Sequence, residues 1–180
     1  PSAMFSGYVK NELTYIINKL KLTNELSASN VINALNTNMK NILSNTRQYT
    51  SAWCGIVNKE NQTLKFCAAG FEYPFLISKD DIKVINYANG PLIGILKDIN
   101  YKEHEVSLEG KTLLLYTDGI IDQQTSTSKR LGRQGLSDKV SNLKGSSPKT
   151  ICTSLIEEVS NESYGFTQFD DILLLAFKFH

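Results

Sequence analysis

Two acidic clusters, each next to an apolar segment, are the residues of this sequence whose type and position could do chemistry. Asp118 follows a strongly apolar run and precedes Gly119, whereas Asp170 and Asp171 stand directly before another apolar run. A carboxylate at the edge of an apolar core is partly desolvated, and an unpaired charge there is unfavourable. Oxygen ligands of this kind suit hard cations such as Mg²⁺ and Mn²⁺, and coordination would remove that penalty. The pattern therefore indicates a metal site, in which Gly119 would let backbone and water approach the metal closely.

The same residues also have a purely structural interpretation. Asp-Gly is a common turn dipeptide, and an Asp-Asp pair before a strand can simply cap that strand. From these two clusters alone, both the metal site and the structural role remain open.

The composition argues against a nucleic-acid-binding, membrane-spanning or zinc-binding protein. The chain has 180 residues, is 41% hydrophobic and carries a net charge of +1, so neither nucleic acid nor a membrane surface is expected as its partner. No apolar run approaches the roughly 20 residues that a membrane helix needs. The three cysteines, Cys54, Cys67 and Cys152, form no CxxC motif and the chain has only two histidines, which argues against zinc and predicts free thiols in a reducing cytoplasm.

The periodicity of apolar residues predicts helices first, then strands, then helices and a last strand. Ser27 is a good N-cap for the second helix, and Ser147 followed by Pro148 is a good start for the last one. Strands grouped together with helices outside them indicate an α+β fold. The expected helices are 3–21, 27–44, 134–143 and one from 148 onward, and the expected strands are 51–57, 63–69, 74–78, 82–87, 104–108, 111–117 and a buried strand 171–179.

Six segments of the sequence match, in order, the motifs of one known family. They are Pro1–Phe5, Cys67–Leu76, Gly90–Gly94, Leu113–Asp122, Leu131–Leu136 and Phe169–Ile172. By these segments the sequence resembles the sporulation stage II protein E-like, sigma-factor-regulatory serine phosphatases of the protein phosphatase 2C superfamily. No single segment is specific, and the resemblance depends on the ordered set.

The resemblance implies a fold that agrees with the α+β prediction. It is a four-layer αββα sandwich of two antiparallel sheets flanked by helices, here lacking its first strands. Residues 1–180 would form a single domain, the C-terminal three-quarters of the family's phosphatase domain.

The resemblance also implies a metal-dependent serine/threonine phosphatase. Asp118 and Asp170 would be catalytic metal ligands, with Gly119 beside them at the metal, while Asp122 and Asp171 would have supporting roles. Two Mn²⁺ or Mg²⁺ ions would lower the pKa of a bridging water, which then attacks phosphorus in line. No residue is assigned to substrate binding.

The partners implied by the resemblance are those of a signalling enzyme. The substrate would be a phosphorylated protein, such as an anti-sigma-factor antagonist, and an upstream sensor or receiver domain would control the phosphatase. A homodimer is compatible with the resemblance, while no contact with nucleic acid or a membrane is expected.

The family's Gly-Asp and Asp-x-x-Gly-His-Gly segments, which supply further metal ligands, would precede residue 1. Residues Pro1–Ala3 are either native or left by cloning. Because Asp118 and Asp170 alone provide few oxygens, we expect the 180-residue chain to bind metal poorly and to have weak or no activity. Two other functions remain open: a catalytically degenerate module for binding or dimerisation, and a sensor or ligand-binding domain in which the aspartates only cap strands.

Overall fold

The structure is a computed structural model that describes residues 2–46, 49–87, 89–96, 98–125 and 129–179. The chain divides into two compact units, which are described separately below. The first unit comprises residues 1–71 and 87–107, and the second comprises residues 72–86 and 108–180.

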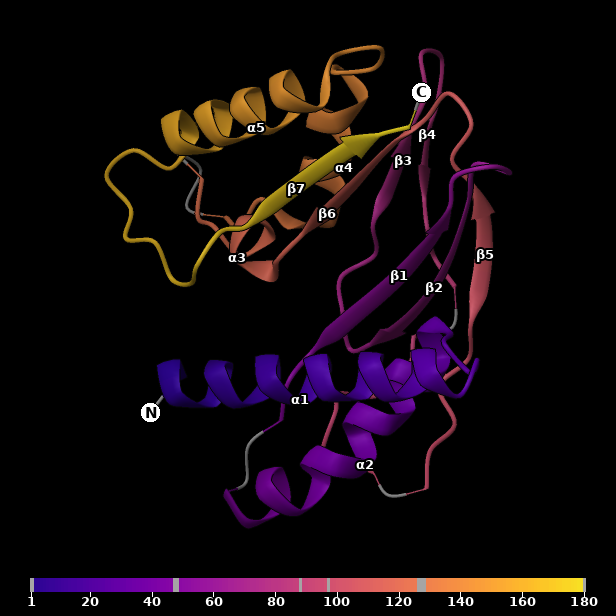
Figure 1. The fold of residues 1–180 in the computed structure, drawn as a ribbon. Helices are drawn as coiled ribbons and strands as arrows, with labels where there is room; N and C mark the ends of the chain where they lie inside the picture. The colour runs from indigo at the N-terminus through magenta and orange to yellow at the C-terminus, as the bar shows by residue number, and fades with distance from the viewer. Residues whose placement is uncertain (1, 47–48, 88, 97, 126–128, 180) are drawn as a thin grey trace. The chain divides into compact units, whose positions relative to one another are not determined.

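The first unit packs two helices against a three-stranded antiparallel sheet (Figure 1). Side chains on one face of the second helix, among them Val31, Leu35 and Met39, form a core with Cys67 and Ala69 of the sheet. This face consists of the periodic apolar positions, so burial of the helix follows directly from its sequence pattern. The elements are α1 (Ser2–Leu22), α2 (Ala28–Thr46), β1 (Ala52–Asn58), β2 (Thr63–Ala69) and β5 (His104–Ser107), with strand order β1-β2-β5.

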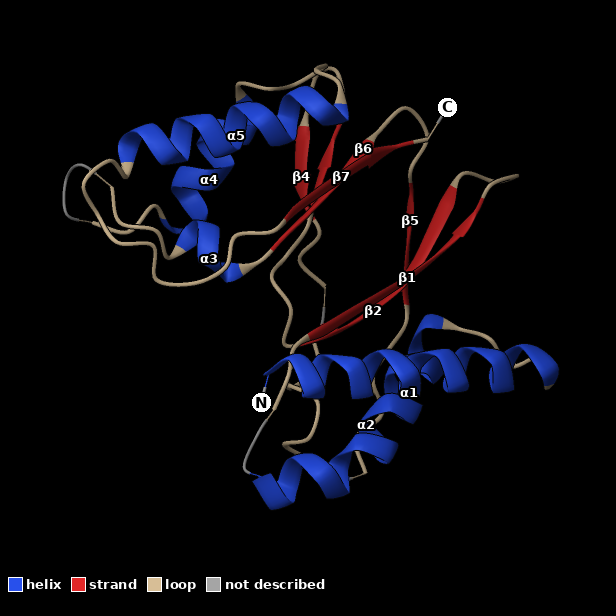
Figure 2. Ribbon diagram, turned by 60° about the vertical axis from the view of Figure 1, so that its left-hand side comes forward, coloured by secondary structure: helices blue, strands red, loops and turns tan. Residues whose placement is uncertain are grey.

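The second unit has a four-stranded antiparallel sheet with helices beside it (Figure 2). Its core joins apolar side chains of the central strands to those of the helices, including Leu114, Leu136 and Leu155, which are fully buried. The strands are β3 (Phe75–Ile77), β4 (Ile82–Val84), β6 (Thr112–Tyr116) and β7 (Leu174–Lys178), in the order β4-β3-β6-β7, and the helices are α3 (Asp118–Ile121), α4 (Gly132–Ser141) and α5 (Pro148–Glu162).

The α+β class and the two antiparallel sheets are confirmed, and some local expectations are wrong. The expected strand 82–87 ends at Val84. The predicted buried strand 171–179 is shorter, because β7 begins at Leu174, and it is an edge strand with Leu175 51% exposed. Its apolar residues suggested burial, but an edge strand has a neighbour on one side only. The expected strand 111–117 is observed as Thr112–Tyr116, and the short helix α3, which the sequence pattern did not predict, begins at Asp118.

The start of α5 provides a test of the predicted cap. The Ser147 hydroxyl accepts a hydrogen bond from the Thr150 amide at 3.1 Å, and Pro148 occupies the first helical position. We expect Ser147→Ala to lower the free energy of unfolding by about 1 kcal/mol, because an amide at the helix start loses its acceptor. Urea denaturation measures this, with Ser160→Ala, on an exposed position of the same helix, as the control. Equal losses in the two variants would contradict the capping role.

Candidate functional site

Asp118 stands where a buried strand becomes a short helix. The strand β6 is buried apart from Leu115, and after it Thr117 has an extended backbone while Asp118 begins α3. The Asp122 amide donates to the Asp118 carbonyl at 2.9 Å, which closes the turn of this helix. The following residues, Gly119 to Ile121, are buried, so the helix is anchored in the core while the Asp118 side chain stays exposed.

The segment that carries the second acidic cluster is hydrogen-bonded to Thr117. The Thr117 hydroxyl donates to the Asp171 carbonyl and accepts from the Leu173 amide, both at 3.0 Å, and the Thr117 amide donates to the Leu173 carbonyl at 3.1 Å. These bonds continue the pairing of β6 with β7, in which Tyr116 lies opposite Leu174. The register of these two strands therefore brings residues 171–173 beside the residue that precedes Asp118.

Gly119 allows the two acidic clusters to meet. A Cβ at this position would overlap the backbone carbonyl oxygen of Asp171. It would also lie 2.9 Å from the carbonyl carbon of Asp171 and 3.2 Å from the backbone carbonyl oxygen of Asp170. Backbone atoms of the two clusters are thus in direct contact at Gly119, and any side chain here would push them apart. Although Asp118 and Asp170 are distant in sequence, their backbones lie side by side at one end of the four-stranded sheet.

The carboxylates themselves are exposed, which corrects the expectation that they are partly desolvated. Asp118, Asp170 and Asp171 are all exposed, because each lies just outside the buried part of its strand, where the chain turns into solvent. Asp170 is held locally: its carboxylate accepts from the Asp171 amide at 2.7 Å, and its carbonyl accepts from the Gln168 side chain at 2.8 Å. Desolvation therefore does not account for acidic residues at these positions.

Asp122 has a partner of its own. Its carboxylate forms an ion pair with Arg130 at 2.7 Å, which links the end of α3 to the polar segment before α4. The same segment is closed by hydrogen bonds from the amide and hydroxyl of Thr125 to the Lys129 carbonyl, at 2.7 and 3.0 Å. Asp122 thus fastens a loop next to Asp118.

Sequence reasoning missed one polar cluster in the same unit. Arg133 makes a bidentate pair with Glu72 at 2.9 and 3.0 Å and lies over the Tyr73 ring at 5.8 Å. Burial raises the pKa of Tyr116 to about 12, with Glu72 adding to the shift and Arg133 opposing it. No sequence signal connects Arg133 with Glu72, because the pairing depends on how α4 packs against the chain before β3.

The two cysteines of the first unit are poor nucleophiles. Burial raises the pKa of the Cys54 thiol to about 11 and that of the Cys67 thiol to about 12, so neither is a reactive thiolate at neutral pH. All three cysteines are free, as predicted. Trp53 is half-buried and stacks on Phe66 at 5.8 Å between ring centroids.

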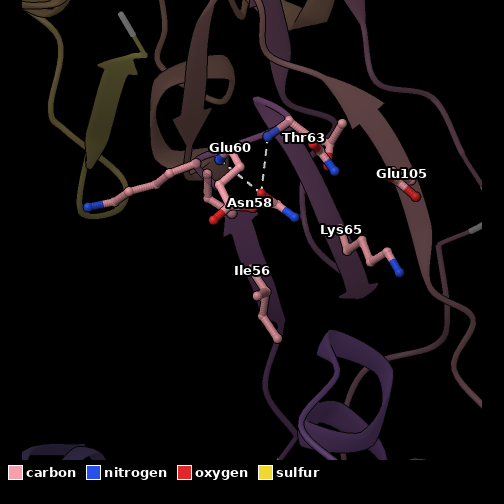
Figure 3. Close-up of a pocket in the computed structure, with 9 residues that line it drawn as sticks. Ile56, Asn58, Glu60, Thr63, Lys65 and Glu105 are labelled. Atoms are coloured by element: carbon pink, nitrogen blue, oxygen red, sulfur yellow. Dashed lines mark hydrogen bonds between the residues drawn. The ribbon is translucent and has the colours of Figure 1, made fainter.

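A cavity of about 680 Å³ lies at the β1–β2 hairpin of the first unit, with acidic and basic residues in its lining (Figure 3). Asn58 accepts hydrogen bonds from the amides of Glu60 and Asn61 at 2.9 and 3.1 Å, so its side chain is used to close the turn. Lys65 and Glu105 lie opposite each other on neighbouring strands. None of the residues that line this cavity is a candidate nucleophile, and they do not form a cluster of metal ligands.

Comparison with known families decides the assignment of the chain. The sequence profile of the family described as "Stage II sporulation protein E (SpoIIE)" matches residues 2–180. The chain belongs to the SpoIIE family.

The solved relatives of this SpoIIE-family chain show its fold. The PP2C domain of SiaA from Pseudomonas aeruginosa superimposes with a TM-score of 0.81 at 19% identity, over 96% of this chain and 70% of that one. The PP2C phosphatase domain of SpoIIE from Bacillus subtilis, with a fragment of its regulatory domain, gives 0.73 at 22% identity, over 94% and 49% of the two chains. The chain therefore has the fold of phosphatase 2C domains.

The chain is also similar to part of a longer protein. The Protein IcfG of Synechocystis sp. is 25% identical over 169 residues, which cover 93% of this chain and 24% of that protein. The chain spans about a quarter of the length of this relative. No helix in the part of the chain that the structure describes is long and apolar enough to cross a membrane.

The oxygen atoms of the candidate site are of the type that binds a hard divalent cation. The carboxylates of Asp118 and Asp170 and the backbone carbonyl of Gly119 would offer oxygen atoms, the donors that Mg²⁺ and Mn²⁺ prefer. Among the described residues no group of three or more His, Cys, Asp or Glu side chains could hold a metal ion. These residues would therefore supply part of a coordination shell rather than a complete one.

Proposed function

We propose that this chain is the larger part of a metal-dependent serine/threonine phosphatase domain, formed by residues 1–180 together. The observation that carries the proposal is the backbone contact at Gly119, which puts the Asp118 and Asp170 clusters side by side in a SpoIIE-family chain. Two acidic clusters at one end of a sheet are what a hydrolase needs in order to hold a divalent cation next to a phosphate ester.

Each residue of the candidate site would have its own role. Asp118, Gly119 and Asp170 would hold one part of a Mn²⁺ or Mg²⁺ site, and a bound cation of this type supplies charge neutralisation and a water of lowered pKa. The Asp171 amide holds the Asp170 carboxylate at 2.7 Å, which supports an orienting role for Asp171. The Asp122–Arg130 pair fastens the adjacent loop and would support the site from outside.

The proposed substrate is a phosphoserine or phosphothreonine on another protein. Exposure of Asp118 and Asp170 supports this choice, since a folded phosphoprotein can only reach carboxylates that lie at the surface. The similarity to sigma-factor-regulatory phosphatases favours an anti-sigma-factor antagonist as that protein, and an upstream sensor or receiver domain as the regulator. A homodimer and a cytoplasmic location belong to the same proposal.

A catalytically degenerate module for binding or dimerisation is the second candidate. It is favoured by the small number of acidic ligands that the described residues bring to the site. Because two carboxylates bind a divalent cation weakly, we expect the 180-residue chain by itself to release little phosphate under either function.

Phosphate release separates the two functions. A longer protein that carries this chain together with the Gly-Asp and Asp-x-x-Gly-His-Gly segments is incubated with Mn²⁺ and a phosphoserine protein or a small aryl phosphate. We expect release that stops when a chelator is added, and much less release by the 180-residue chain. No release by the longer protein would favour the degenerate module, and robust release by the 180-residue chain would contradict the incomplete metal site.

A further inference from the structure

A pocket rich in lysine lies at the other end of the four-stranded sheet. Its floor is the last cross-strand row of the sheet, in which Thr112 of β6 lies between Ile77 of β3 and Lys178 of β7. Since β6 runs from Thr112 toward Asp118, this row and the candidate phosphatase site are at opposite ends of the strand. We call the cavity the lysine pocket; it has a volume of about 480 Å³ and is lined by Ile77, Ser78, Lys79, Gly110, Thr112, Lys144, Gly145, Ser146 and Lys178.

Two turns form the walls of the lysine pocket. The turn after β3 is closed on itself, because the Ser78 amide and hydroxyl both donate to the Asp81 carbonyl, at 2.8 and 3.0 Å. The turn after α4 is joined to it by Lys144, whose ammonium group donates to the Asp80 carbonyl at 3.3 Å. A Cβ at Gly145 would lie 3.8 Å from Cγ of Lys79, so the stem of this lysine runs along the second turn. The walls are thus built by contacts between segments far apart in sequence.

All the charged side chains that line the lysine pocket are positive. Its lining includes Lys79, Lys144 and Lys178 and contains no aspartate or glutamate. In the part of the chain that the structure describes, neither Lys79 nor Lys178 takes part in an ion pair. A concave surface lined by cations concentrates the positive potential and attracts anions.

A further hydroxyl residue and a helix start add to the lysines. Ser146 lines the cavity and directly precedes the N-cap of α5. The start of a helix of 15 residues carries a partial positive charge and favours a nearby anion. Ammonium groups, hydroxyls and a helix start are the donors with which proteins bind phosphate.

We propose that the lysine pocket binds a small phosphate compound of high negative charge, such as a chain of two or three phosphates. Three lysines around one cavity match several negative charges better than one. The lining has no aromatic side chain on which a nucleobase could stack, so the phosphate chain itself would provide the affinity. The site is independent of the proposed phosphatase centre.

Binding of inorganic tripolyphosphate tests the proposal. Calorimetric titration of the 180-residue chain is carried out with a chelator present, so that no metal at Asp118 and Asp170 contributes. We expect saturable binding that weakens in the order tripolyphosphate, pyrophosphate, orthophosphate and that weakens further with added salt. In the nuclear magnetic resonance spectrum, the amide signals of Gly145 and Ser146 should shift on addition of tripolyphosphate.

Charge-removing variants locate the site. Lys79→Gln and Lys178→Gln should each weaken tripolyphosphate binding about tenfold, because each removes a cation in or near contact with the ligand. Lys129→Gln, an exposed lysine of the same unit that does not line the pocket, is the matched control and should bind as the original chain does. Absence of saturable binding, no dependence on the number of phosphates, or an equal loss in Lys129→Gln would overturn the proposal. Because binding is measured without metal, failure here would leave the phosphatase proposal unaffected.

Discussion

Replacing Gly119 with alanine is expected to lower the free energy of unfolding by about 2 kcal/mol or more, because the new methyl group would meet backbone rather than a flexible side chain. The Cβ would overlap the Asp171 carbonyl oxygen and lie 2.9 Å from the carbonyl carbon. Alanine normally stabilises a helix relative to glycine. A lower free energy of unfolding in Gly119→Ala would therefore reflect the backbone contact between the acidic clusters. Urea denaturation provides the value.

Gly135→Ala is the matched control for the Gly119 variant. Gly135 is also a helical glycine of the second unit, but its added Cβ would lie 2.8 Å from Cδ1 of Leu131, the end of a side chain that can turn away. We expect a change within about 1 kcal/mol of the original free energy of unfolding, since the helical preference of alanine offsets the crowding. Equal losses in both variants would show that close backbone packing at Gly119 is not what holds Asp170 and Asp171 in place.

Asp118→Asn and Asp170→Asn are expected to have the largest effects on activity. In a longer protein with measurable Mn²⁺-dependent phosphatase activity, each should reduce phosphate release about 100-fold or more, because an amide cannot replace a carboxylate charge at the metal. In the 180-residue chain, where activity is expected to be weak, each should weaken Mn²⁺ binding about tenfold. Electron paramagnetic resonance of free Mn²⁺ measures that binding directly.

Asp138→Asn provides the same change of charge away from the site. Asp138 is an exposed residue of α4 that accepts a hydrogen bond from Gln134 at 2.8 Å. Its replacement should alter neither phosphate release nor Mn²⁺ binding. A loss as large as that of the Asp118 and Asp170 variants would mean that overall charge, rather than coordination at the strand ends, governs the metal affinity.

Local sequence patterns predicted most of the elements of this chain. The strand 63–69 is observed with the expected residues, and the caps at Ser27 and Ser147 are observed as hydrogen bonds that their hydroxyls accept from the amides of Asn30 and Thr150. These features depend on interactions between residues a few positions apart, such as periodic burial and capping, so the sequence contains the information directly. The strand 171–179 was expected to be buried because apolar composition does not distinguish an edge strand from a central one.

The order of residues by itself determined that Asp118 and Asp170 each stand next to an apolar strand, since that is a statement about near neighbours. Only the tertiary structure decided that they meet. The pairing of Tyr116 with Leu174, the hydrogen bonds of Thr117 and the absence of a side chain at Gly119 together bring the two clusters into contact. The lysine pocket likewise depends on three strands in register and two turns. Register and packing arise from contacts between distant parts of the chain, for which local preferences carry no signal.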